Sequence, residues 1–160
     1  MKIYFASDHA GYDLKTKLKS FVVGLGYEVE DCGPHEYNAD DDYPDFVVPC
    51  ARLVATTIES LGVIIGGSGQ GEAMVANRTL GIRCALFYGK REAENTIDAL
   101  ENKSIDSFDI LRLTRQHNNA NMLSLASRFL TDDEAIQAVR VFIETPFSNE
   151  ERHTRRIEKF

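Results

Sequence analysis

Short apolar runs alternate along the chain with longer segments of helical periodicity, and this alternation constrains the fold most strongly. The runs that have the length and composition of buried β-strands span residues 3–6, 27–31, 61–65, 83–87 and 122–126. Parallel strands need crossover connections, which are usually helices. We therefore expect an α/β fold, a three-layer α/β/α sandwich whose Rossmann-like five-stranded parallel sheet is followed by a C-terminal helix.

The helical segments carry their own start and stop signals. Apolar residues spaced for one helical face run from 14 to 25, and Gly26 is expected to end that helix. Pro44 is expected to open the next helix. The predicted buried stripe of that helix is Val47, Cys50, Ala51, Val54 and Ile58. Capping-box signatures at 131–134 and again at 148–151 predict the starts of the last two helices.

Composition and charge limit the classes of function. The chain has 160 residues, 43% of them hydrophobic, so we expect residues 1–160 to form one domain with its own core. Its 25 acidic residues outnumber its 18 basic residues, which gives a formal charge of −7 and argues against nucleic acid or an anionic membrane as a partner. No run of 18 apolar residues is present to span a bilayer.

The cysteines and the first residues of the chain indicate where in the cell the protein is expected to be. The three cysteines, Cys32, Cys50 and Cys84, are odd in number and widely spaced, so we expect reduced thiols in core positions rather than a disulfide framework or a nucleophile. The first apolar run stops at Ser7, far short of a secretory signal. These features predict a cytoplasmic protein.

One segment departs from the regular pattern. Residues 90–113 are polar and weakly periodic, and they are interpreted as a helical excursion or a mobile loop. A solvated surface is expected for its acidic residues, which are Glu92, Glu94, Asp98, Glu101, Asp106 and Asp109.

Four glycines lie between the third strand and the helix that follows, in the segment from Gly66 to Glu72. A tight turn needs only one or two glycines, so we favour a cradle of backbone amides that binds an anion. The segment lacks both the order of the dinucleotide-binding fingerprint and the Lys of a phosphate-binding P-loop. Ligands of open α/β sheets bind outside the carboxyl ends of the strands, and this rule selects residues 7–9 and 66–72.

Glu72 has two interpretations. A carboxylate in the first turn of a helix often only stabilises that helix, by about 0.3 to 1 kcal/mol. Beside a pocket of amides, the same carboxylate can remove a proton α to a carbonyl while the amides hold the oxyanion. The helix dipole lowers the basicity of Glu72 and burial raises it, and the sequence does not decide between the two effects.

Other polar residues also occur near predicted strand ends. Asp8 is expected to cap the first helix, a role that leaves His9 unexplained. His117 and Asn118 precede the fifth strand, where such a pair is more often surface than catalytic. The spacing of these residues does not match a metal-ligand signature, so no metal is expected.

The final helix is basic in an otherwise acidic chain. Arg152 and Arg156 lie four residues apart and share one helical face. They either pair with surface acids or clamp a phosphate monoester, and the residues alone leave both possibilities open.

Together these motifs resemble, nearly end to end, the type B ribose-5-phosphate isomerases and their relatives that isomerise galactose 6-phosphate and allose 6-phosphate. The resemblance rests on Ala6–Tyr12, Asp42–Pro44, Gly66–Glu72, Ala76–Asn77, Gly81–Arg83, His117–Asn121 and Arg152–His153. It implies a Rossmann-like fold, no cofactor and no metal, a small-molecule sugar phosphate as substrate, and at least a homodimer whose active site is shared across the interface.

The resemblance also implies roles for single residues. One branch of the family uses a cysteine as the base at the start of the loop, where this chain has Gly66, and the other branch uses the glutamate that corresponds to Glu72. His117, from the partner subunit, is implied as the acid that opens the furanose ring. The anion hole would be Gly67, Ser68, Gly69, Gln70 and Gly71. The remaining substrate contacts implied are Asp8, His9 and Asn118, with Arg128, Arg152 and Arg156 on the phosphate.

The implied activity is the interconversion of D-ribose 5-phosphate and D-ribulose 5-phosphate through a cis-enediolate, a step of the non-oxidative pentose phosphate pathway. The alternatives are an isomerase of six-carbon sugar phosphates and a non-catalytic nucleotide- or flavin-binding module. Residues 90–113 look longer than the family's usual connection between the fourth strand and His117.

Overall fold

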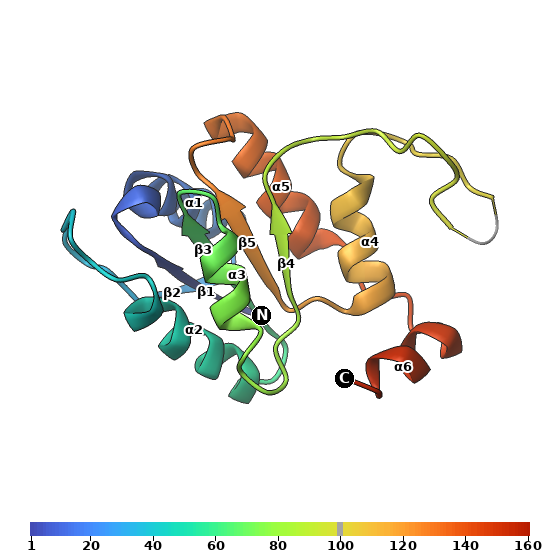
Figure 1. Cartoon of the computed structure of the whole chain (residues 1–160), viewed down its shortest axis with the longest axis horizontal. Coiled ribbons are helices and arrows are strands. Elements are labelled where there is room, and N and C mark those ends of the chain that lie inside the picture. Colours follow the sequence, from blue (N-terminus) through green and yellow to red (C-terminus); the bar gives the residue numbers. More distant parts are fainter. Residues whose placement is uncertain (99–100) are drawn as a thin grey trace.

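A computed structural model describes residues 1–98 and 101–160. The strands form one five-stranded parallel sheet in the order β2-β1-β3-β5-β4 (Figure 1). Their bounds are β1 Lys2–Ser7, β2 Glu28–Asp31, β3 Ser60–Gly66, β4 Cys84–Phe87 and β5 Met122–Ala126. The five predicted strands are confirmed to within one residue at each end.

Helices cover both faces of the sheet, which confirms the three-layer architecture (Figure 1). A 3-10 turn, η1 (His9–Gly11), leads into the first helix. The helices are α1 Tyr12–Gly24, α2 Pro44–Thr56, α3 Gln70–Ala76, α4 Asp109–Asn118, α5 Asp132–Glu144 and α6 Glu151–Ile157. α2 and α3 pack on one face, α1, α4 and α5 pack on the other, and α6 contacts α4.

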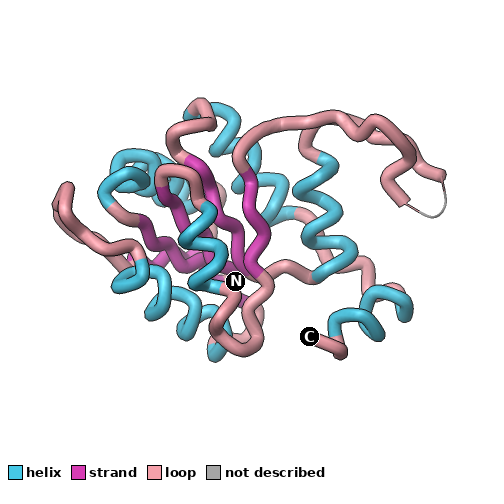
Figure 2. Tube along the Cα trace, viewed as in Figure 1, coloured by secondary structure: helices cyan, strands magenta, loops and turns pink. Residues whose placement is uncertain are grey.

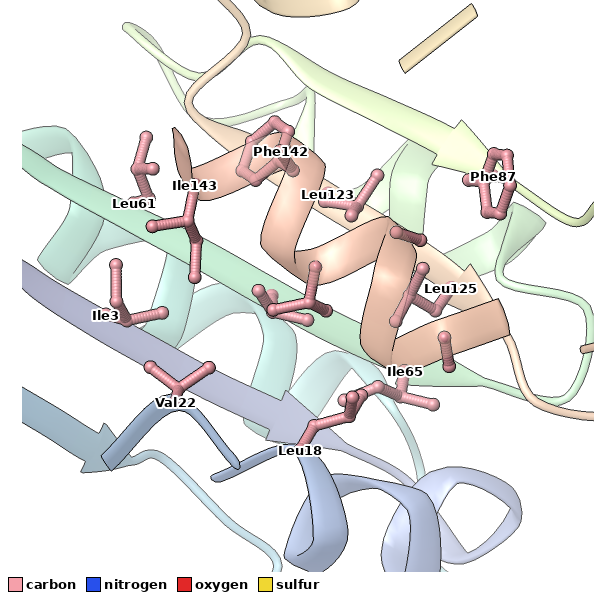
Figure 3. Packing of buried hydrophobic residues seen from close by; sticks show 14 of the residues in the cluster. Ile3, Leu18, Val22, Leu61, Ile65, Phe87, Leu123, Leu125, Phe142 and Ile143 are labelled. Atoms are coloured by element: carbon pink, nitrogen blue, oxygen red, sulfur yellow. The ribbon is translucent and has the colours of Figure 1, made fainter. Parts of the chain in front are cut away.

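The core follows from the alternation of side chains along each strand. Ile3 and Phe5 of β1 point to the α1/α5 face, whereas Tyr4 and Ala6 point to the α2 face. Figure 3 shows the α1/α5 side, where Leu18 and Val22 of α1 and Phe142 and Ile143 of α5 close over the sheet. β3 is buried along its whole length, as a central strand covered on both faces must be.

The register brings three strand ends to one edge. Ser7 of β1 pairs with Ile65 of β3, and Gly66 of β3 pairs with Ala126 of β5. The segments that follow these strands therefore meet outside the carboxyl edge of the sheet.

Two helix signals are confirmed. Pro44 is the first residue of α2. The Thr131 side chain accepts from the Glu134 backbone N–H while the Glu134 carboxylate accepts from that of Thr131, a complete capping box. α1 ends at Gly24, and Gly26, with φ +88°, occupies the left-handed turn that follows.

Two other predictions are wrong at element ends. Ile58 lies beyond the end of α2 and is 92% exposed, because the backbone is already extended at Thr57. Ser148 does not cap α6: the N-cap is Glu150, which makes no side-chain capping bond. The Ser148 hydroxyl instead accepts from the Glu150 backbone N–H at 3.4 Å.

Among its described residues, the segment 90–113 contains no helix or strand before α4 begins at Asp109 (Figure 2). Asp109 itself is buried and accepts hydrogen bonds from Ser104 and Arg112, so the expectation that it is solvated is wrong. Residues 99–100 of this segment lie outside the described residues. Its unusual length for the family stays a prediction. In the part of the chain that the structure describes, no helix is long and apolar enough to cross a membrane.

Candidate active site

The glycine-rich loop follows β3 and turns directly into α3. Gly69 has φ +70°, and a Cβ there would lie 2.8 Å from the Leu86 side chain and 3.0 Å from the Leu125 backbone. Only glycine fits both the left-handed conformation and this close approach. The Ser124 hydroxyl donates to the Gly69 carbonyl at 2.7 Å and fixes the loop to β5. The loop, which includes the half-buried Ser68, is therefore anchored to β5.

Glu72 is buried in the first turn of α3, and only 4% of its surface is exposed. Its carboxylate reaches back to the end of β3: a Cβ on Gly66 would lie 1.8 Å from Glu72 Oε1. Burial raises the pKa of Glu72, the charge of Asp8 raises it further, and a backbone N–H opposes them. Burial is the largest of these three effects, and a buried carboxylate of raised pKa suits a general base.

The residues that follow β1 lie against this loop. Asp8 caps η1 by accepting from the backbone N–H groups of Ala10 at 2.9 Å and Gly11 at 3.2 Å. The prediction that Asp8 caps the first helix itself is wrong, because η1 intervenes and the N-cap of α1 is Gly11. A Cβ on Gly11 would lie 2.4 Å from the Ile65 carbonyl, and glycine thus allows η1 to pack on β3. This packing brings Asp8 close enough to influence Glu72.

A cation faces the loop from the end of β5. The Arg128 backbone N–H donates to the Gly67 carbonyl at 3.1 Å. Its guanidinium carbon would lie 3.3 Å from a Cβ on Gly67, so the side chain lies across the glycine backbone. The positive charge of Arg128 also acts on His9, where it opposes the protonation of the imidazole.

A second set of predicted residues lies around the end of α4. The ring of His117 stacks on that of His153 of α6, with centroids 4.2 Å apart. The Arg152 Nε–H donates to His153 Nε2 at 3.0 Å, and Arg152 also pairs with Glu150 at 2.8 Å. Burial, with the charges of His153 and Arg152, lowers the pKa of His117. Arg156 is exposed on α6.

Within one chain, the residues around the glycine-rich loop and the residues around the end of α4 lie apart. Glu72 follows the carboxyl end of β3, whereas His117 precedes the amino end of β5. The two strands run in register from Gly62 and Met122 to Gly66 and Ala126, a length of about 13 Å. The end of α4 and α6 accordingly lie at the opposite end of the sheet from the glycine loop (Figure 1).

Comparison with known proteins bears on this divided site. The sequence model of the family described as Ribose/Galactose Isomerase matches residues 3–106 and 104–160. The chain belongs to the ribose/galactose isomerase family.

Relatives within the family match almost the whole chain. Ribose-5-phosphate isomerase B of Mycobacterium tuberculosis is 38% identical over 158 residues, which cover 99% of this chain and 86% of the relative. The crystal structure of ribose-5-phosphate isomerase B from Mycoplasma genitalium with bound ribulose-5-phosphate is 36% identical, with a TM-score of 0.83 over 99% of this chain and 92% of that one. The Thermotoga maritima enzyme is 37% identical, with a TM-score of 0.80 and coverage of 99% and 95%.

The structure adds two residues that sequence reasoning did not select. The Tyr43 hydroxyl lies against the loop, 2.7 Å from where a Cβ on Gly71 would be. Asp41 accepts from the backbone and the ring of His9. Tyr43 had a signal, since it belongs to one of the family motifs, but Asp41 lay within an acidic turn that gave none.

Proposed function

We propose that this member of the ribose/galactose isomerase family interconverts D-ribose 5-phosphate and D-ribulose 5-phosphate, with Glu72 as the general base. The observation that carries the proposal is the buried Glu72 carboxylate beside a rigid loop of glycine amides. An aldose–ketose isomerisation needs these two parts: a base that moves a proton between C2 and C1, and donors that hold the negative charge on oxygen.

In the proposed mechanism, His117 of the partner subunit protonates the ring oxygen of the furanose while the O1 hydroxyl releases its proton to water. The bond between C1 and the ring oxygen breaks, and the aldehyde forms. Its lowered pKa makes the imidazolium a stronger acid. Glu72 then removes the C2 proton of the aldehyde, and the electron pair moves through the new C1–C2 double bond to O1. The amides of residues 67–71, with Ser68 and Gln70, stabilise this cis-enediolate. A proton passes from O2 to O1, the C2–O2 bond becomes the carbonyl, and Glu72 returns its proton to C1 to give the ketose.

The substrate contacts complete the proposal. Asp8, His9 and Asn118 bind the sugar phosphate, and Arg128 binds the phosphate together with Arg152 and Arg156 of the partner subunit. Arginine suits this role because its planar donors match phosphate oxygens. No metal and no cofactor takes part.

A homodimer with shared sites is part of the proposal. It is supported by the separation of the two residue sets along the sheet, since a second copy is needed to place His117 near Glu72. A cytoplasmic location also belongs to the proposal, and it is supported by cysteines that remain free thiols.

The test compares the wild type with Glu72→Gln, following ribulose 5-phosphate by ketose absorbance in the presence of EDTA. We expect turnover to fall by about 10²- to 10⁴-fold while substrate still binds. Glu144→Gln is the matched control, because Glu144 is exposed at the end of α5, and it should keep wild-type turnover.

The same assay separates the rival functions. Allose 6-phosphate serves as competitor and alternative substrate. Wild-type turnover of the hexose phosphate without turnover of ribose 5-phosphate would overturn the pentose assignment. Undiminished activity in Glu72→Gln would remove Glu72 from the mechanism.

A further inference from the structure

Asp41 approaches the site from a different part of the chain than the residues described so far. It lies in the connection between β2 and α2, which is anchored at the carboxyl end of β1 by a hydrogen bond from the Ser7 N–H to the Gly33 carbonyl at 3.0 Å. A turn then forms in which the Asp41 N–H donates to the Asn38 carbonyl at 3.3 Å. The connection thus carries Asp41 back to the residues that follow β1.

A single oxygen of Asp41 makes two contacts with His9. Asp41 Oδ1 accepts from the backbone N–H of His9 at 3.0 Å and lies 2.7 Å from His9 Nδ1. A carboxylate oxygen can only accept, so the Nδ1 nitrogen carries the proton and donates it. The backbone and the ring of His9 are therefore both fixed, and Nε2 is the nitrogen left for a ligand.

The second oxygen of Asp41 indicates that the contact does not serve stability alone. The Asp41 side chain is only 6% exposed, and its Oδ2 atom is buried with no hydrogen-bond partner among the described residues. A buried carboxylate oxygen without a partner weakens folding. A neutral amide at this position would accept the same two bonds without burying a charge, so the charge calls for another explanation.

The groups around His9 supply that explanation. Asp41 and Asp8 favour the imidazolium form of His9, whereas burial and the Arg128 guanidinium oppose it, and the hydrogen bond to Asp41 is the largest effect. The pKa of His9 is consequently raised. The side chain of His9 is 29% exposed, so a ligand can reach it.

We propose that Asp41 is a positioning residue for the substrate's phosphate: its carboxylate holds His9 as an imidazolium whose Nε2–H donates to the phosphate beside Arg128. The proposal rests on the proposed function, because it names the group that a sugar phosphate brings to this site. The phosphate of a sugar phosphate is close to dianionic at neutral pH, and a charge-assisted hydrogen bond from an imidazolium is stronger than one from a neutral ring.

The first test does not depend on turnover. The ring resonances of His9 are followed by NMR as a function of pH in the wild type, in Asp41→Asn and in Asp40→Asn, with and without inorganic phosphate. Asp40 is the neighbouring, exposed carboxylate, so its variant is the matched control. In Asp41→Asn we expect the His9 midpoint to fall toward that of an ordinary histidine and phosphate binding to weaken about tenfold. Asp40→Asn should match the wild type.

The second test is kinetic. With ribose 5-phosphate, Asp41→Asn should raise KM about tenfold and leave kcat within about twofold, because the phosphate does not react. Its kcat/KM should decline at a lower pH than that of the wild type, since His9 loses its proton earlier. In a His9→Gln background, adding Asp41→Asn should change KM no further.

Three results would overturn the proposal. The first is a His9 titration midpoint that is the same in Asp41→Asn as in the wild type. The second is a wild-type midpoint below the ordinary range of histidine, a measurement that does not depend on the folding of any variant. The third is a loss of kcat/KM in Asp41→Asn that is uniform across pH and accompanied only by a lower Tm, the mark of a structural role. A wild type without turnover would defeat the proposed function alone, because the titration with inorganic phosphate still decides the role of Asp41.

Discussion

At the scale of single residues, Gly66 and Glu72 share one space. The 1.8 Å distance from a Cβ on Gly66 to Glu72 Oε1 means that any side chain at position 66 displaces the carboxylate. A base at the end of β3 and a base at the start of α3 are therefore mutually exclusive in this fold. This explains in steric terms why a glutamate accompanies a glycine here.

The glycine at position 66 can be tested directly. Gly66→Ala should lower kcat by at least about 100-fold, because the Glu72 carboxylate must shift from its observed position. Gly24→Ala is the control, since a Cβ there meets nothing within 4 Å, and it should retain full activity. Wild-type kcat in Gly66→Ala would show that Glu72 does not need its observed position.

The raised pKa of Glu72 has consequences for activity and for stability. The base works in its ionised form, so the acid limb of kcat should lie above the range of an ordinary glutamate. The folded-state pKa exceeds the unfolded one, so the associated stability is present below the unfolded pKa and is lost as pH rises through the folded pKa.

Glu72→Gln cannot ionise and escapes that loss. The Tm of Glu72→Gln minus that of the wild type should therefore be larger at about pH 7 than at about pH 4. Thermal unfolding at the two pH values measures this difference. An equal Tm difference at both values would contradict the burial of an ionised carboxylate.

Sequence reasoning reached part of the site at this scale. The strand-end rule selected residues 7–9 and 66–72 because parallel strands end at one edge, and the register confirms that they meet. It did not reach Asp41, because a long connection returns to the site only through tertiary contacts. Nor did it predict the burial of Asp109, which depends on a local network with Ser104 and Arg112.

At the scale of elements, the half-buried Arg115 ties α4 to its neighbours. Arg115 donates from Nε to the Thr145 carbonyl at 3.1 Å and from Nη1 to the Ala120 carbonyl. Its guanidinium also lies 5.5 Å from the centre of the Phe142 ring. These contacts fix the end of α4, which carries His117.

Removal of this arginine should therefore affect both stability and turnover. Arg115→Met leaves two backbone carbonyls without their donor, at a cost of about 1 to 3 kcal/mol in unfolding free energy. It should also lower kcat, because His117 is held less firmly. Urea unfolding and the isomerase assay measure the two effects. Arg78→Met, on an exposed side chain, is the control, and equal stability of the two variants would refute the role of Arg115.

Elements were predictable where packing and periodicity agree. β3 is buried on both faces and is therefore a continuous apolar run, and α5 begins with a complete capping box. Predictions failed at Ile58 and Ser148 because α2 ends two residues before Ile58 and the N-cap of α6 lies two residues after Ser148. Local sequence signals do not contain the tertiary contacts that decide such ends.

At the scale of the whole molecule, the divided site predicts complementation between inactive subunits. Glu72→Gln lacks the base and His117→Asn lacks the acid, so each variant alone should be nearly inactive. When the two are refolded together in equal amounts, about half of the dimers are mixed and half of their sites are intact. About a quarter of wild-type activity should return. Verified mixed dimers with no more activity than the separate variants would contradict the shared site.

The central claim is that a buried glutamate moves a proton through an enediolate, and isotope exchange tests it most directly. The wild type and Glu72→Gln are each incubated with ribose 5-phosphate in D₂O with EDTA, and NMR follows deuterium at C2 of the aldose and C1 of the ketose. We predict deuterium incorporation together with turnover in the wild type, and the loss of both in Glu72→Gln. Exchange and turnover at wild-type rates in Glu72→Gln would contradict the account.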